Sequence, residues 1–142
     1  MELLFKTIGS VLIIFTTSYI GFSKAAALRK RHKKLLHIKS CIVNLKEQIR
    51  MHAGETEFLL EHCFDPFPPD YQSLNAEDVK MFKDFLALLG SSDTQTECER
   101  CELFISALNP CIENSEKQYR ELNKLYKSTG VTIGIFICIL LL

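Results

Sequence analysis

Both ends of this 142-residue chain lack charge, because no charged side chain occurs in residues 7–22 or in residues 128–142. A spanning helix needs about 20 predominantly apolar residues. The segment 3–23 reaches that length, and residues 125–142 approach it if the neighbouring lysines extend toward the headgroups. We therefore expect a transmembrane helix at each place, of which the second is short and leaves half-insertion as an alternative.

The part between these segments lacks the alternation of apolar and polar residues that is typical of strands. It also lacks a G-x-x-x-x-G-K-[ST] motif, so hydrolysis of nucleotides by a P-loop is excluded. The four histidines have no serine or cysteine arrangement that indicates nucleophilic chemistry. We therefore expect an all-α protein that is not an enzyme and has no cofactor.

Apolar residues recur at heptad spacing on both sides of the middle of the chain. One seam comprises Leu28, Leu35, Ile38, Ile42, Leu45 and Ile49, and Arg31 interrupts it. A second seam runs from Cys101 through Ser115 to Tyr126 and continues into the last apolar segment. We expect an antiparallel helical bundle whose two long heptad-patterned helices are continuous with the transmembrane helices.

Local signals divide the expected helical domain, residues 24–124. Three prolines make residues 64–71 a loop, because proline cannot donate a backbone hydrogen bond. Asn75 and Asp78 have capping-box spacing, Gly90 ends a helix, and Ser92 is the expected cap of the next one. The expected helices are therefore at about 24–52, 55–63, 75–89 and 92–127.

The formal net charge of zero conceals a split along the chain. Residues 1–46 contain nine Lys/Arg and one acid, whereas residues 47–142 contain eight bases and sixteen acids. The basic residues that follow the first apolar segment are Lys24, Arg29, Lys30, Arg31, Lys33 and Lys34. Their position favours membrane lipid over nucleic acid as the partner, and it places the middle domain in the cytoplasm. An uncleaved anchor is favoured over a signal peptide, because cleavage would require export of this run.

Residues 55–116 contain fourteen acids and three bases. This excess has two interpretations, namely solubility beside an anionic membrane or a docking face for a basic partner. The residues proposed for such a face are Glu55, Glu57, Asp93 and Glu97.

A glycine motif in the last apolar segment has a weaker implication. Gly130 and Gly134 form a G-x-x-x-G pair, which predicts close helix packing in the membrane but also fits ordinary membrane glycines. The sequence leaves homo-oligomerisation open.

Cys98 and Cys101 form a C-x-x-C pair. Zinc binding would require two more ligands, for which His62 and Cys63 are the candidates. A redox couple is a second alternative, and two small apolar residues on one helix face are the favoured interpretation. Disulfides are not expected in a cytoplasmic domain.

Several short segments together carry a resemblance to a known family. They are Ile8–Ile14, Ile20–Phe22, Leu45–Ile49, Phe85–Asp93 and Lys124–Leu142. In this order they resemble the stage III sporulation protein AB family of endospore formers. The middle of this chain departs from the family pattern, because the Pro-rich loop stands where additional helix is usual.

The resemblance implies a bundle similar to the cytoplasmic domain of the inner-membrane platform proteins of type II secretion and type IV pili. It implies a platform subunit of the channel complex between mother cell and forespore, beside a secretion-type ATPase. The implied location is the outer forespore membrane, with the soluble domain in the mother-cell cytoplasm. The alternatives are a membrane-tethered zinc or thiol protein and a helical adaptor of another secretion system.

Overall fold

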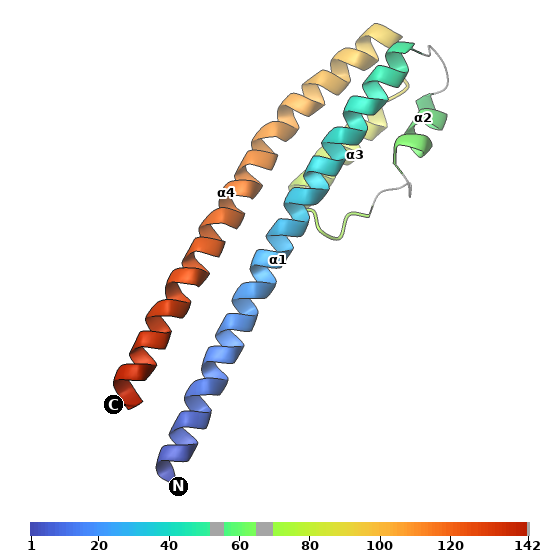
Figure 1. Ribbon diagram of the computed structural model, residues 1–142. Coiled ribbons are helices and arrows are strands. Elements are labelled where there is room, and N and C mark those ends of the chain that lie inside the picture. Colours follow the sequence, from blue (N-terminus) through green and yellow to red (C-terminus); the bar gives the residue numbers. More distant parts are fainter. Residues whose placement is uncertain (52–55, 65–69, 142) are drawn as a thin grey trace. The chain divides into compact units, whose positions relative to one another are not determined.

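The computed structural model describes residues 1–51, 56–64 and 70–141, apart from some side chains near the two chain ends and in residues 56–58. Its four helices are α1 (Glu2–Met51), α2 (Thr56–Cys63), α3 (Ala76–Leu88) and α4 (Thr94–Leu141), as Figure 1 shows. The described residues contain no strand, which confirms the all-α prediction. α1 and α4 are single helices in which an apolar segment and a charged segment follow one another.

The chain forms two compact units. One, called the helix pair below, consists of Met1–Arg29 and Glu116–Leu142. The other, called the bundle, consists of Lys30–Ser115. The units therefore change near residues 29 and 115, several residues away from the membrane boundaries expected at 23 and 124.

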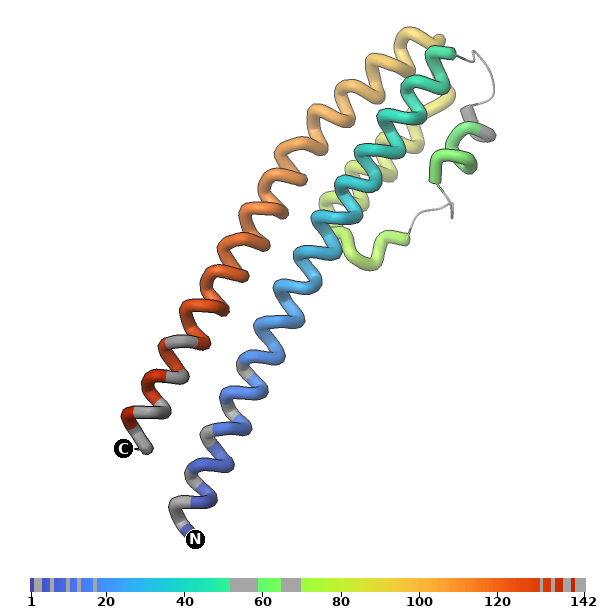
Figure 2. The backbone as a smooth tube through the Cα atoms, viewed as in Figure 1, coloured from blue at the N-terminus to red at the C-terminus, as the bar shows by residue number. Residues whose placement is uncertain are grey.

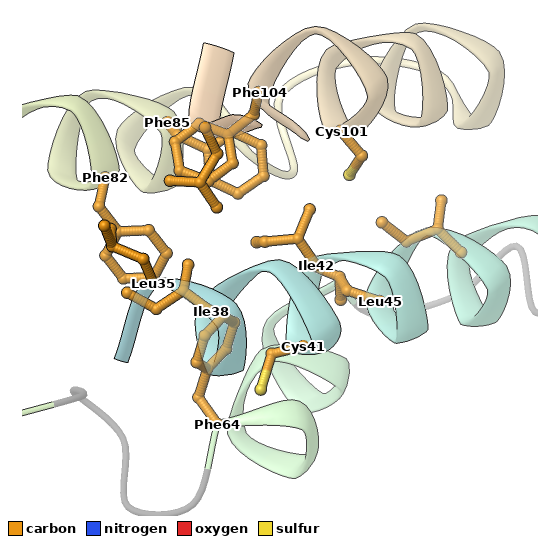
Figure 3. Close-up of a cluster of buried hydrophobic side chains, with 12 residues drawn as sticks. Leu35, Ile38, Cys41, Ile42, Leu45, Phe64, Phe82, Phe85, Cys101 and Phe104 are labelled. Atoms are coloured by element: carbon orange, nitrogen blue, oxygen red, sulfur yellow. The ribbon is translucent and has the colours of Figure 1, made fainter. Parts of the chain in front are cut away.

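The hydrophobic core belongs to the bundle, since all of its members lie between Leu35 and Leu108. The α1 heptad residues of the bundle are all buried, with exposures of 0–4% at Leu35, Ile38, Ile42, Leu45 and Ile49. Figure 3 shows Leu35 and Ile42 of this row facing residues of α3 and α4. The heptad spacing thus predicted the face of α1 that the bundle buries.

α3 and α4 contribute an aromatic cluster to this core. The rings of Phe85 and Phe104 stack with centroids 4.3 Å apart, and Phe82 lies 5.9 Å from Phe104. Phe64, just after α2, meets Phe82 edge-on at 5.4 Å. Phe85 is buried, and its neighbour Leu86 is half-buried against the same core. The phenylalanines contribute most to this cluster, because large rings bury the most apolar area.

Arg31 is buried rather than membrane-facing, which corrects its assignment to the membrane-proximal basic group. Its side chain donates from Nε to Asp78 Oδ2 at 2.8 Å and from Nη2 to Asp78 Oδ1 at 3.1 Å. The exposed fractions are 8% for Arg31 and 5% for Asp78. This hydrogen bonding raises the pKa of Arg31 above its ordinary value. Arg31, which interrupts the heptad seam, therefore forms an ion pair that links α1 to α3.

Asp78 also organises the start of α3. Its Oδ2 accepts a hydrogen bond from the backbone N–H of Asn75 at 3.3 Å, as the capping-box spacing predicts. One carboxylate thus satisfies a free donor at the helix N-terminus and the guanidinium of Arg31. The first turn of α3 is held against α1 by that single side chain.

A second polar contact lies at the α4 seam. Ser115 is fully buried and donates its hydroxyl hydrogen to the carbonyl of Ile112 at 2.7 Å. His32 Nδ1 lies 3.0 Å from the same hydroxyl oxygen. Because a serine has one hydroxyl hydrogen, His32 must donate from Nδ1 here. Neighbouring residues 31 and 32 of α1 therefore bond to α3 and α4, respectively.

We expect Asp78→Ala to lower the free energy of unfolding by about 3–5 kcal/mol, because Arg31 would stay buried without a counter-charge. The double variant Arg31→Met/Asp78→Leu should recover most of this loss, since apolar residues can replace a buried pair. Urea denaturation of the full chain in mild detergent, followed by circular dichroism, measures both. Glu77→Ala, at an exposed neighbour on α3, is the control. An equal loss of unfolding free energy in Asp78→Ala and Glu77→Ala would contradict a special role for the Arg31–Asp78 pair.

Candidate functional site

The helix pair exposes large apolar side chains, whereas the bundle buries side chains of this kind. On α1, Phe15, Tyr19 and Phe22 are 71–78% exposed, and on α4, Phe136 and Ile139 are 66% and 69% exposed. Among the described residues of this unit, none belongs to the hydrophobic core. Such a large exposed apolar surface requires an apolar surrounding.

One helix among the described residues is long and apolar enough to cross a bilayer. It lies within Thr7–Met51, and only 6% of its most apolar window is buried, which is too little for a core helix. An N-terminal apolar helix of this kind indicates membrane association. The second segment, residues 125–142, remains a prediction.

Most of the predicted basic residues are available to a membrane surface. Lys24, Arg29, Lys30 and Lys33 are exposed and Lys34 is half-buried. None of these five side chains makes a hydrogen bond or ion pair to another residue in the described part of the chain. Their ammonium and guanidinium groups are therefore open to anionic headgroups.

The two helices of the pair approach closely at Gly21 rather than at the predicted Gly130. Gly21 is buried, and a Cβ added there would overlap the ring of Tyr126. A Cβ added at Gly130 would meet nothing within 4 Å. Gly134 lies outside the residues whose side-chain positions are described. Sequence reasoning missed the Gly21 contact, because a glycine alone does not indicate which ring will cover it.

An elongated groove of about 490 Å³ runs between the two segments of the helix pair, which lie side by side in Figure 2. Ile14 and Ile133 line one end of it, whereas Arg29, Tyr119 and Asn123 line the other. The walls between the ends include the small residues Ser18, Ala25, Ala26 and Gly130. These short side chains leave space between the two helices. The residues at its ends give the groove one apolar end and one polar end.

The four acidic residues proposed as a docking face do not form one surface. Glu55 and the side chain of Glu57 lie outside the described residues. Asp93 is exposed and caps α4, accepting hydrogen bonds from the Thr96 hydroxyl at 2.5 Å and the Thr96 N–H at 3.4 Å. These bonds lower the pKa of Asp93. Asp93 therefore replaces Ser92 as the cap, because its carboxylate is in reach of the first turn.

Glu97 is an internal residue, with an exposed fraction of 2%. Its Oε1 accepts from the backbone N–H of Ser92 at 3.1 Å and from Arg100 Nη1 at 3.1 Å, while Oε2 is buried with no hydrogen-bond partner among the described residues. Arg100 also donates to the carbonyl of Leu88, at the end of α3. Glu97 thus holds the turn between α3 and α4 and does not present its carboxylate to a partner.

An exposed acidic stripe occurs instead along α4. Its residues alternate in steps of three and four, which places them on one face of the helix, and all are exposed: Glu99, Glu102, Ser106, Asn109 and Glu113. Lys46 on α1 donates to Glu102 at 2.6 Å, and this bond lowers the pKa of Glu102. Leu103 beside the stripe is 72% exposed. The same 3.6-residue period that marks a buried seam could have revealed this face.

The cysteine pair does not have the surroundings of a zinc or redox site. Cys101 is fully buried, and this burial raises the pKa of its thiol to about 11. Cys98 Sγ points to the carbonyl of Lys46 at 3.9 Å, and Cys63 Sγ to Gln48 Oε1 at 4.0 Å. Among the described residues, no three His, Cys, Asp or Glu side chains are grouped as metal ligands. The pair therefore fits two small residues packed on one face of α4.

We expect Cys101 to react with iodoacetamide about 100-fold more slowly in the native chain than after denaturation, at a pH of about 8. The reason is that a pKa of about 11 rather than 9.0 reduces its thiolate fraction by that factor. Mass spectrometry of the labelled cysteine measures the rate, with added zinc as a second condition. Rapid native labelling that zinc suppresses would restore the metal hypothesis.

Residues 6–73 and 69–142 match the family model of stage III sporulation protein AB, in two segments that overlap at residues 69–73. No curated protein and no solved structure matches the chain. The match extends over nearly all residues of the chain. This chain therefore belongs to the stage III sporulation protein AB family.

Proposed function

We propose that this sporulation protein is a non-enzymatic membrane platform subunit of the channel complex between mother cell and forespore. The main observation that supports this proposal is the contrast between the two units of the chain. The helix pair has an apolar exterior, whereas the bundle buries its apolar residues and exposes charged ones. Such a division suits a protein that fixes a polar docking domain to a membrane.

The proposed topology has both apolar segments in the outer forespore membrane, both termini outside the cytoplasm, and the bundle in the mother-cell cytoplasm. Exposed Lys24 and Arg29 follow the first segment, and Lys117, Lys124 and Lys127 precede the second. Positive residues stay on the cytoplasmic side of membrane helices. Both segments therefore support the same orientation.

The proposed partner of the bundle is a secretion-type ATPase with a basic docking surface, together with other components of the channel. The acidic stripe of α4 offers carboxylates for such a surface, and the exposed Leu103 offers an apolar contact at its edge. Complementary charge speeds encounter and selects the partner. Self-association of the chain is compatible with this arrangement.

A reporter fused after Leu142 tests the topology. We expect alkaline phosphatase to be active and green fluorescent protein to be dark at this site, since both report a position outside the cytoplasm. The same reporters inserted before Asn75, an exposed residue at the start of α3, should give the opposite result. A cytoplasmic signal after Leu142 would contradict the second transmembrane segment.

Charge reversal on α4 tests the docking face. We expect Glu99→Lys/Glu113→Lys to reduce co-purification of the secretion-type ATPase from sporulating cells by about tenfold, because like charges would then oppose a basic partner. The matched control is Glu77→Lys/Asp84→Lys, which makes the same charge change at exposed positions of α3. Unchanged recovery with the α4 variant, or equal loss with both, would argue against the stripe. Circular dichroism of each variant verifies that its helices are intact.

A further inference from the structure

The groove of the helix pair is a feature that the platform role does not explain. At its polar end, the side chains of Arg29, Tyr119 and Asn123 make no hydrogen bond or ion pair with any other residue in the described part of the chain. At its other end the lining is aliphatic, from Ile14 and Ile133. A ligand that fits both ends has an anionic or polar head and an apolar tail.

The length of the groove matches one leaflet of a bilayer. Ile14 and Arg29 are fifteen positions apart on α1, which corresponds to about 22 Å of helix. Tyr119 and Ile133 are fourteen positions apart on α4, or about 21 Å. One leaflet measures about 15 Å of hydrocarbon and about 5–7 Å of headgroup region. Both walls therefore extend from the headgroups to the middle of the bilayer.

The groove is large enough for a lipid acyl chain. Its volume of about 490 Å³ is many times the roughly 10–15 Å³ that one water molecule needs by the same measure. A groove of this volume that extends over one leaflet suits a chain molecule lying along the helices.

The charge around the polar end indicates the class of headgroup. Around this end the helix pair carries six bases and two acids: Lys24, Arg29, Lys117, Arg120, Lys124, Lys127, Glu116 and Glu121. Arg120 is paired with Glu116 at 2.5 Å, whereas Arg29 lines the groove without a counter-charge among the described residues. A guanidinium in this position suits the phosphate of a lipid.

We propose that this groove binds one anionic phospholipid of the cytoplasmic leaflet, with its phosphate at Arg29 and an acyl chain extending toward Ile14 and Ile133. The inference rests on the membrane placement proposed above. The lipid fills the space between α1 and α4 on the side of the pair where Gly130 leaves it open. It would thereby join the two helices where their own side chains do not.

The test uses the full chain in nanodiscs of equal parts phosphatidylglycerol and phosphatidylcholine with identical acyl chains. After transfer to detergent, native mass spectrometry measures the lipid that each chain retains. We expect one bound phosphatidylglycerol, favoured over phosphatidylcholine by about fivefold, as a charge-assisted contact provides. Arg29→Gln should abolish the preference, and Gly130→Phe should abolish retention of both lipids because its ring fills the groove.

Two matched variants control for general effects. Gly9→Phe adds the same ring at a position that also has nothing within 4 Å but does not line the groove, and it should retain lipid normally. Lys24→Gln removes an exposed charge that does not line the groove and should keep the preference.

The outcomes separate this proposal from the membrane placement. Normal lipid retention by Gly130→Phe, or equal retention of the two lipids by the unmodified chain, overturns the lipid site. A dimer that Gly130→Phe dissociates would assign the groove to a second copy and also overturn it. A chain that co-elutes with nanodiscs yet retains no phosphatidylglycerol overturns the lipid site alone, whereas failure to enter nanodiscs overturns both proposals.

Discussion

The bundle depends on one buried ion pair, between Arg31 of α1 and Asp78 of α3. A buried pair gives little net stability, because desolvation offsets most of the attraction, but losing either partner is costly. The pair therefore acts mainly on register: only when Asp78 faces Arg31 are both charges compensated. That register brings Phe82 and Phe85 of α3 to the aromatic core, where Phe104 of α4 joins them. The ion pair and the packing of the aromatic rings therefore favour the same register of α3 against α1.

The same pair divides the basic run of α1 into two kinds of residue. Arg29 and Arg31 are two positions apart, so their side chains point roughly 200° away from each other around the helix. Arg31 enters the bundle, whereas Arg29 lines the groove of the helix pair. Six basic residues that look equivalent in the sequence therefore contribute five accessible charges and one internal one. Bundle packing and the accessible positive charges therefore come from neighbouring residues of one helix.

Periodicity explains why so much of the fold was predictable. The heptad residues of α1, the caps of α3 and the uncharged ends are local signals that need no knowledge of partners in space. Glu97 illustrates the opposite case, since nothing local distinguishes it from the exposed Glu99 and Glu102. It is buried where α4 meets the turn after α3, and both Ser92 of that turn and Arg100 of α4 donate to its carboxylate. Gly21 is similar, because its importance comes from Tyr126, more than a hundred residues away.

The sequence by itself determined the all-helical class, the apolar N-terminal helix, the buried face of α1 and the family. Each of these follows from spacing or composition, which a single helix already expresses. Only the tertiary structure decided which charges are internal, which acids share a surface, and that a groove with a polar end lies between two apolar segments. The physical reason is that burial and pairing depend on the element facing a residue, and a helix does not carry that information in its own period.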